Sequence, residues 1–320
     1  MKLWDDAITI SLAGIDLYAF GLFCMIGAVA AATAVWALCR GYQMEKGSAG
    51  ILTGLMLLCG ALVSRIGFCL MNQSLGCMMP LASWFRITEG GWSLSGMILG
   101  ALAGSRMAAA VFRVPPKRTM DITVTALPLM IAAIKYAEEK IPDFDISRPL
   151  GDGFPAGISI LTVQDEYGTY LATRRVGLVL ALVLFFILVF SLLRKNRKDG
   201  DQGILFLLLC GAGGILLESL RYDHFLEFSF VRLQMVLYAG ILVWGTVLAI
   251  RQDEANRKGL RRTAIITCIL AIGICGGIEF ALDRMSINHV VLYVIMIAAL
   301  AVPVSLGCCL LRRKEPKSLE

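Results

Sequence analysis

The sequence predicts an all-α, polytopic integral membrane protein with about nine transmembrane helices, and three observations predict it. Of the 320 residues, 58% are hydrophobic and only 17% are charged, whereas a soluble domain is about 45–50% apolar and about 25% charged. The apolar residues gather in long uninterrupted runs, and the basic residues gather in alternate loops. A disordered, fibrous or disulfide-stapled secreted protein is therefore excluded.

Nine apolar runs are each long enough to cross the hydrocarbon core of a membrane, which takes about 20 residues. They are residues 15–38, 51–71, 93–113, 120–136, 176–193, 203–220, 231–250, 264–282 and 289–311. Glycine, proline and asparagine stand between these runs, as is typical of turns. The segment 137–175 is acidic and rich in turn residues, so we expect a loop outside the membrane. A loop of this length is usually functional, although a plain connector is the alternative.

The basic residues predict how the chain is oriented. Eighteen Lys and Arg residues fall in loops 39–50, 113–119, 194–200 and 251–263 and in the tail 312–320. The segments on the other side, 1–14, 72–92, 137–175 and 283–288, hold seven. Because basic loops stay in the cytoplasm, we expect an outer N-terminus and a cytoplasmic C-terminus; the membrane is expected to be a bacterial cytoplasmic membrane only by the family resemblance given below.

Cysteine and histidine usage argues against metal chemistry. There are two histidines and ten cysteines, and nine of the cysteines lie in or beside apolar runs without the paired spacing of a zinc site. We expect these cysteines to be small buried hydrophobes. We also expect no metal, no cofactor and no nucleic-acid partner.

Three ionisable residues within the spans point to a site. A charge inside hydrocarbon costs about 2.5–3.5 kcal/mol on insertion scales. We therefore expect Arg65, Glu218 and Arg221 each to have a charged partner or a functional role. Glu218 and Arg221 are three residues apart, and on one helix their side chains meet. Joined by Arg65, they would form a net positive cluster that suits a phospholipid phosphate, because guanidinium groups bind phosphate oxygens in pairs. The alternative is a Glu–Arg clasp that only holds helices together.

The segment before the third span adds a second feature. Glu89, Gly90 and Gly91 directly precede the helix, and free backbone N–H groups at a helix N-terminus can bind an anion. Three glycines spaced by four residues follow at positions 96, 100 and 104, which predicts close packing against another helix.

These residues resemble the motifs of the bacterial prolipoprotein diacylglyceryl transferases over about residues 12–250. The resemblance rests on IDLYAFGLFCMIGA, SRIGF, RITEGGWSLSGMILG and GILFLLLCGAGGILLESLRYD, and on Gln234 at the start of a span. It implies a transferase-like domain of seven helices at 1–255 and an additional pair of helices with a basic tail at 256–320. Family members transfer diacylglyceryl from phosphatidylglycerol to the cysteine thiol of a lipoprotein precursor.

The resemblance also assigns roles to individual residues. It implies catalytic positions at Glu218, Arg221 and Ser95, and headgroup-binding positions at Arg65, Glu89, Gly90, Gly91 and Gln234. Ser95 stands where the family has its catalytic histidine, and Phe20 stands where it has a tyrosine. A thiol must become a thiolate to react, and neither side chain is a base near neutral pH.

Two hypotheses follow. The first is an active transferase in which Lys135, Glu138, Glu139, Arg174 or Arg175 takes over as base or phosphate clamp. The second is a non-catalytic descendant of the family that binds phosphatidylglycerol, another anionic phospholipid or a lipoprotein precursor.

Overall fold

The computed structural model describes the greater part of the chain. It covers residues 8–12, 15–74, 81–85, 91–139, 162–165, 168–193, 198–221, 227–228, 231–253, 255, 257–285 and 288–311. Nine helices in these ranges are long and apolar enough to cross a membrane. The protein is therefore an all-α polytopic membrane protein, as the sequence predicts.

The chain divides into two compact units by contacts. Unit 1 contains residues 1–202 and 220–228, and unit 2 contains residues 203–219 and 229–320. The predicted division near residue 255 rests on a family resemblance and stays a prediction, whereas contacts group the two helices before that boundary with the two after it.

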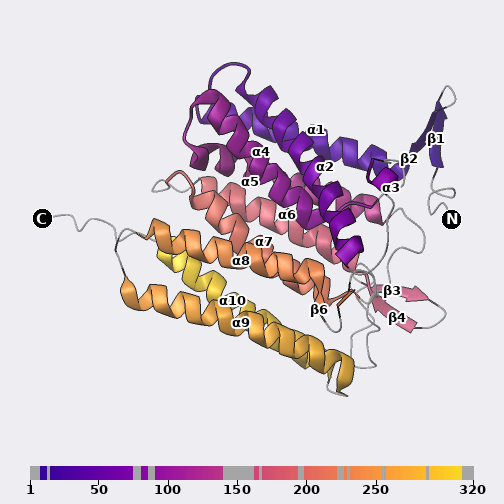
Figure 1. Cartoon of the computed structure of the whole chain (residues 1–320), viewed down its shortest axis with the longest axis vertical. Helices are drawn as coiled ribbons and strands as arrows, with labels where there is room; N and C mark the ends of the chain where they lie inside the picture. The colour runs from indigo at the N-terminus through magenta and orange to yellow at the C-terminus, as the bar shows by residue number, and fades with distance from the viewer. Residues whose placement is uncertain are drawn as a thin grey trace, which may run out of the picture. The chain divides into compact units, whose positions relative to one another are not determined.

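Unit 1 contains five of the long helices. They are α1 (Ala19–Gly41), α2 (Ser48–Ser74), α4 (Leu94–Phe112), α5 (Pro116–Glu138) and α6 (Thr173–Leu192), and a short helix, α3 (Leu81–Trp84), follows α2. Helix α5 packs against α1, α4 and α6, and α2 packs against α4 (Figure 1). The side chains of α5 from Thr119 to Pro128 are all buried, so α5 forms the core of this unit.

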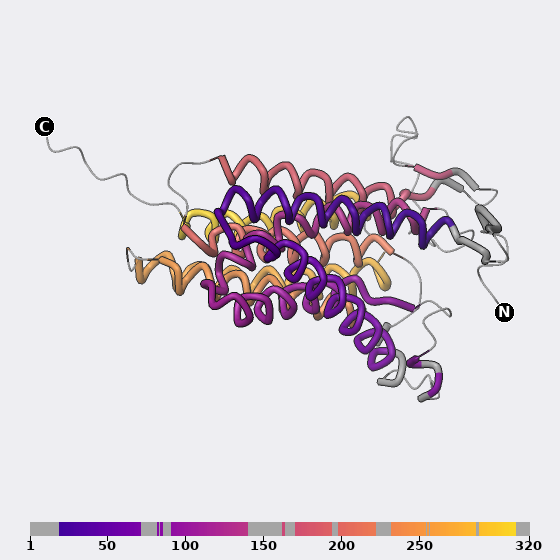
Figure 2. The backbone as a smooth tube through the Cα atoms, turned by 90° about the horizontal axis from the view of Figure 1, so that it is seen from above, coloured from indigo at the N-terminus to yellow at the C-terminus, as the bar shows by residue number. Residues whose placement is uncertain are grey.

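Two β-hairpins lie in unit 1. Strands β1 (Ile8–Leu12) and β2 (Ile15–Tyr18) are antiparallel with Leu12 opposite Ile15, and β3 (Thr162–Asp165) and β4 (Gly168–Leu171) form the second hairpin. Figure 1 shows both hairpins at one end of the unit, which we call the hairpin end, and Figure 2 shows α1 and α6 beginning on the same side. Helices α1 and α6 begin at this end, and α5 ends there.

The first hairpin corrects the predicted start of the first span. The apolar run begins at residue 15, but the helix begins at Ala19 because residues 15–18 pair with β1 as a strand. The predicted span at 120–136 is confirmed and extends to Pro116–Glu138. Proline at the first turn favours a helix start, because its missing N–H has no helical partner there.

Unit 2 contains the other four long helices: α7 (Asp201–Ser219), α8 (Leu233–Gln252), α9 (Lys258–Arg284) and α10 (His289–Leu311). Two short strands, β5 (Glu227–Phe228) and β6 (Val231–Arg232), precede α8 in the chain. Helix α10 packs against α8 and α9. Added Cβ atoms at Gly211 and Gly307 would meet Leu242 and Leu208, so α7 packs closely against α8 and α10.

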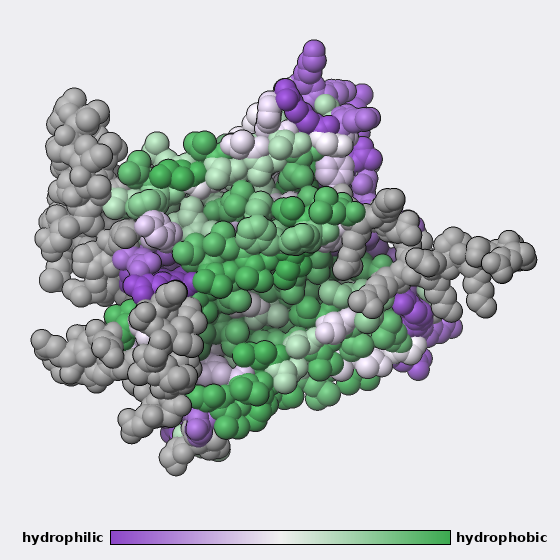
Figure 3. Space-filling model, turned by 180° about the vertical axis from the view of Figure 1, so that it is seen from behind, coloured by the Kyte–Doolittle hydropathy of each residue, from purple (hydrophilic) through white to green (hydrophobic). Residues whose placement is uncertain are grey.

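The hydrophobic residues form a band across the middle of the helices, and the hydrophilic residues gather at the helix ends (Figure 3). Many large apolar side chains in this band face outward; Phe186 is 53% exposed and Val294 is 59% exposed. An apolar outer surface of this kind is the surface that lipid tails cover.

Candidate functional site

Two groups of polar residues in unit 1 come from the positions that the sequence singled out. The first lies where α2 meets the start of α4, and the second lies where α5 ends and α6 begins. A third group, in unit 2, surrounds the last turn of α7.

Arg65 fixes the chain that leads into α4. Its side chain is buried, with the residue 7% exposed, and its guanidinium group donates to the carbonyl oxygens of Trp84 (3.3 Å) and Gly91 (2.9 Å). Gly91 has φ +79°, and a Cβ there would overlap the Phe68 ring, so only glycine fits without strain. Arg65 therefore positions this turn through main-chain contacts.

Serine residues form the hydrogen bonds at the start of α4. Ser93 is the N-cap residue, and its hydroxyl accepts a hydrogen bond from the Gly96 N–H (3.2 Å). The Ser64 hydroxyl donates to the Ser93 carbonyl (2.8 Å), and the Ser93 N–H donates to the Ser64 carbonyl (3.2 Å). One donor of the first helical turn is thus already used. Of the predicted anion-binding turn, Glu89 and Gly90 lie outside the described residues.

Ser95 lies in the middle of this group. It is 0% exposed, and its hydroxyl is 2.9 Å from the Ser93 hydroxyl. Phe20 lies in the first turn of α1. Neither of these two serine hydroxyls is a base near neutral pH. The contact of Ser95 with Ser93 therefore supplies no base for a thiol.

The α5–α6 charge cluster consists of Lys135, Glu138 and Glu139 from α5 and Arg174 and Arg175 from α6. Lys135 Nζ is 2.8 Å from Glu138 Oε2, and Arg175 Nε is 2.8 Å from Glu139 Oε1. The Arg174 guanidinium donates to the Glu138 carbonyl, which is one of the acceptors that a helix end leaves without an intrahelical partner. The five residues proposed from the sequence as a base or phosphate clamp are therefore neighbours.

The cluster lies at the hairpin end and carries a net charge of +1, from three cations and two anions. Its members are partly accessible: the Arg175 and Glu139 side chains are 35% and 28% exposed. Gly177 on α6 allows the methylene groups of Lys135 to lie against the helix, since a Cβ at this position would be 3.0 Å from Lys135 Cδ. This packing holds the ammonium group of Lys135 beside Glu138.

The third group donates hydrogen bonds to the last main-chain carbonyl groups of α7. Glu218 and Ser219 are 7% and 0% exposed. The Arg232 guanidinium donates to the Glu218 carbonyl (2.8 Å), and the Tyr293 hydroxyl donates to the Ser219 carbonyl (3.0 Å). Arg232, directly before α8, is 6% exposed and joins α8 to α7.

The sequence predicted that Glu218 and Arg221 lie on one helix, and the structure corrects this placement, whereas the pairing of their side chains stays a prediction. Helix α7 ends at Ser219, so Arg221 lies two residues beyond the helix. Gln234 lies in the first turn of α8 and is half-buried. The meeting of Arg65 with Glu218 concerns residues of both units and stays a prediction.

Within the described ranges, no three His, Cys, Asp or Glu residues come together as a metal site would need. No protein-family model matches the chain, and no curated protein matches it. The resemblance to the diacylglyceryl transferases accordingly stays a prediction.

Proposed function

We propose that this chain is a multi-pass protein of a bacterial cytoplasmic membrane that binds phosphatidylglycerol, or another anionic phospholipid, without transferring its diacylglyceryl group. The observation that carries the proposal is the α5–α6 charge cluster. It is net positive and partly exposed, and it lies where two membrane-length helices meet. Phospholipid phosphates occupy this level of a membrane, and guanidinium groups are suited to them.

The charge asymmetry of the loops supports an orientation with the hairpin end outward. The N-terminus then lies outside, the basic C-terminus lies in the cytoplasm, and the cluster faces the outer leaflet. Lipoprotein precursors, which leave the cytoplasm through this membrane, are a second possible partner at the same face.

We propose that the chain does not transfer the diacylglyceryl group because of Ser95. A diacylglyceryl transferase needs a base for the cysteine thiol, and the residue in the histidine position is a buried serine whose hydroxyl contacts Ser93.

Diacylglyceryl transfer is the second candidate function, and it is favoured by the position of the Glu138 carboxylate in the same cluster as Arg174 and Arg175. In this reaction Glu138 takes the thiol proton, the thiolate forms a C–S bond to the diacylglyceryl carbon, and the C–O bond to glycerol phosphate breaks. Arg174 and Arg175 would bind the departing phosphate.

Phospholipid titration of the purified chain tests the binding proposal. Replacing both arginines (R174Q/R175Q) should weaken phosphatidylglycerol binding about tenfold, the effect of about 1.4 kcal/mol, and leave phosphatidylcholine binding unchanged. The variant E139Q should have the opposite effect, because it raises the net charge of the cluster. Unchanged affinity in both variants would contradict the proposal.

A transfer assay separates the two candidates. Labelled phosphatidylglycerol is incubated with a peptide that carries a lipoprotein-precursor cysteine, and E138Q serves as the matched variant. We expect no labelled peptide above background. Labelling that depends on Glu138 would establish the transferase in place of the binding protein.

A further inference from the structure

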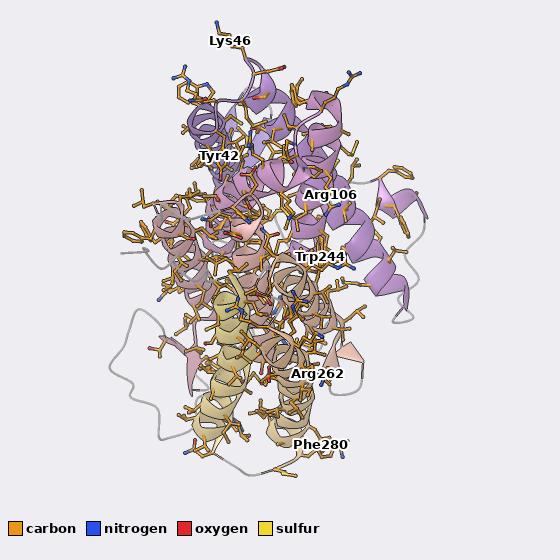
Figure 4. The ribbon with its side chains drawn as sticks, turned by 90° about the vertical axis from the view of Figure 1, so that its left-hand side faces the viewer. Tyr42, Lys46, Arg106, Trp244, Arg262 and Phe280 are labelled. Carbon is orange, nitrogen blue, oxygen red and sulfur yellow. The ribbon has the colours of Figure 1, made fainter. Side chains whose placement is uncertain are left out.

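Two arginines of α4 lie on one exposed stripe of the helix, away from the sites described above. The stripe consists of Ala103, Arg106, Met107, Ala110 and Arg113, all of which are exposed. The side chains of Arg106 and Arg113 form no hydrogen bond or ion pair with any residue in the part of the chain that the structure describes. Figure 4 labels Arg106 among the side chains of unit 1.

Other arginines at the same end of unit 1 are engaged by the protein. The Arg118 guanidinium is 3.1 Å from a carboxylate oxygen of Asp199. The Arg40 guanidinium lies 3.7 Å from the centre of the Trp36 ring. The two arginines of the stripe thus differ from their neighbours in having no such contact.

The charge of Arg106 is unfavourable without a counter-charge, because of where this residue lies along α4. Helix α4 has 19 residues and is about 28 Å long, close to the thickness of the hydrocarbon core. Arg106 lies seven residues before the C-cap residue Arg113, so it is about 10 Å inside that end of the helix.

The spacing of the two arginines suits one phosphate group. Residues seven apart lie on the same face two turns from each other, and their side chains can converge on a point between them. Ala110 occupies that interval and leaves space beside the helix. Met107 and Val111, which are 52% and 61% exposed, provide an apolar surface next to it for acyl chains.

We propose that Arg106 and Arg113 bind the phosphate of an anionic phospholipid at the end of α4 opposite the hairpin end. In the proposed orientation this is the cytoplasmic leaflet. The site is separate from the α5–α6 charge cluster and does not depend on the function proposed for that cluster. The ligand chemistry is a phosphate ester, and its two possible sources are a membrane lipid and a soluble glycerol phosphate.

Native mass spectrometry of the full chain tests this site, with added phosphatidylglycerol, phosphatidylcholine or soluble glycerol phosphate as the probe. The wild-type chain should retain phosphatidylglycerol in preference to phosphatidylcholine, and R106Q/R113Q should bind it about tenfold more weakly. The matched control R40Q changes an exposed arginine at the same end and should bind as the wild type does. Soluble glycerol phosphate should not compete.

Equal phosphatidylglycerol affinity in R106Q/R113Q and the wild type would overturn the proposal. Competition by soluble glycerol phosphate at equal affinity would overturn the lipid as its source. If R106Q/R113Q does not fold, R106K keeps the charge but not the forked donor geometry and should bind several-fold more weakly; unchanged binding would again overturn it. In R174Q/R175Q one bound phosphatidylglycerol should remain that is lost when R106Q/R113Q is added, which separates this site from the α5–α6 charge cluster.

Discussion

Single glycines set the distance between α2 and α4. A Cβ on Gly96, Gly100 or Gly104 would collide with backbone atoms of Val63, Cys59 or Leu55, respectively. The three glycines therefore let the two backbones touch along about two turns of helix. The spacing by four predicted this contact, because small residues on one helix face typically mark an interface in membranes.

The substitution Gly100→Val should separate these helices. We expect a loss of about 1–3 kcal/mol of stability, as is typical of overpacking, measured as a lower melting temperature in detergent. Gly54→Val is the matched control, since nothing lies within 4 Å of a Cβ at Gly54. Equal melting temperatures for the two variants would contradict the packing described for α2 and α4.

Buried charges were harder to predict at the residue scale. The sequence marked Arg65 as buried in a helix, and the structure confirms this, but its acceptors are main-chain carbonyls of Trp84 and Gly91. Such acceptors exist at every residue and leave no mark in the sequence. Arg232 was missed for the same reason, because its guanidinium group donates to the main-chain carbonyl of Glu218.

At the scale of the element, the N-cap residue Ser93 stabilises the start of α4. Ser93→Ala removes the hydroxyl that accepts from the Gly96 N–H, and loss of an N-cap costs about 1 kcal/mol. We expect a matching decrease in the free energy of unfolding in mild detergent and denaturant. Ser105→Ala is the control, because the Ser105 hydroxyl donates only to the Leu102 carbonyl within α4; a larger loss in that variant would argue against the cap.

The turn between α8 and α9 contains an acid-sensitive contact. Asp253 is buried; burial raises its pKa, but hydrogen bonds from Arg257 and Arg261 outweigh this and lower the pKa below its usual value. Such a carboxylate stabilises the fold above its unfolded-state pKa, and this contribution is lost as the pH falls through the folded-state value.

Acidification should therefore lower the melting temperature of the wild type more than that of Asp253→Asn. The variant cannot ionise and should already be less stable at neutral pH. Melting curves between neutral pH and the acid range provide the measurement. Parallel pH profiles for the two proteins would show that Asp253 does not contribute.

Helices were easier to predict than the short strands beside them. Hydropathy over long runs predicted all nine membrane-length helices, but it also assigned residues 15–18 to the first helix. These residues pair with Ile8–Leu12, and a run of four cannot be told from a helix start by hydropathy alone. The β3–β4 hairpin within the predicted loop at 137–175 was missed for a similar reason, since each strand has four residues.

At the scale of the whole molecule, the orientation is a prediction from charge alone. In a chain without its native cysteines, a cysteine placed at Val163 should react with a membrane-impermeant thiol reagent in intact cells. A cysteine at Glu45, in the loop between α1 and α2, should react only after the membrane is opened. The reverse pattern would invert the proposed orientation and place the α5–α6 charge cluster in the cytoplasm.

The sequence predicted the membrane class but only part of the candidate site. The class depends on summed hydropathy, which every residue of a span contributes to. The site depends on which side chains of separate helices become neighbours, as Arg175 and Glu139 do. No spacing within either helix encodes that contact.

The membership of α7 in unit 2 has a consequence for synthesis of the protein. Its close contacts are with Leu242 of α8 and with Gly307 of α10, both of which leave the ribosome later. Helix α7 therefore lies in the bilayer without its α10 partner until about 90 further residues have been translated. A chaperone or insertase that shields this helix during the delay should matter more for α7 than for α4, whose partner α2 has already been made.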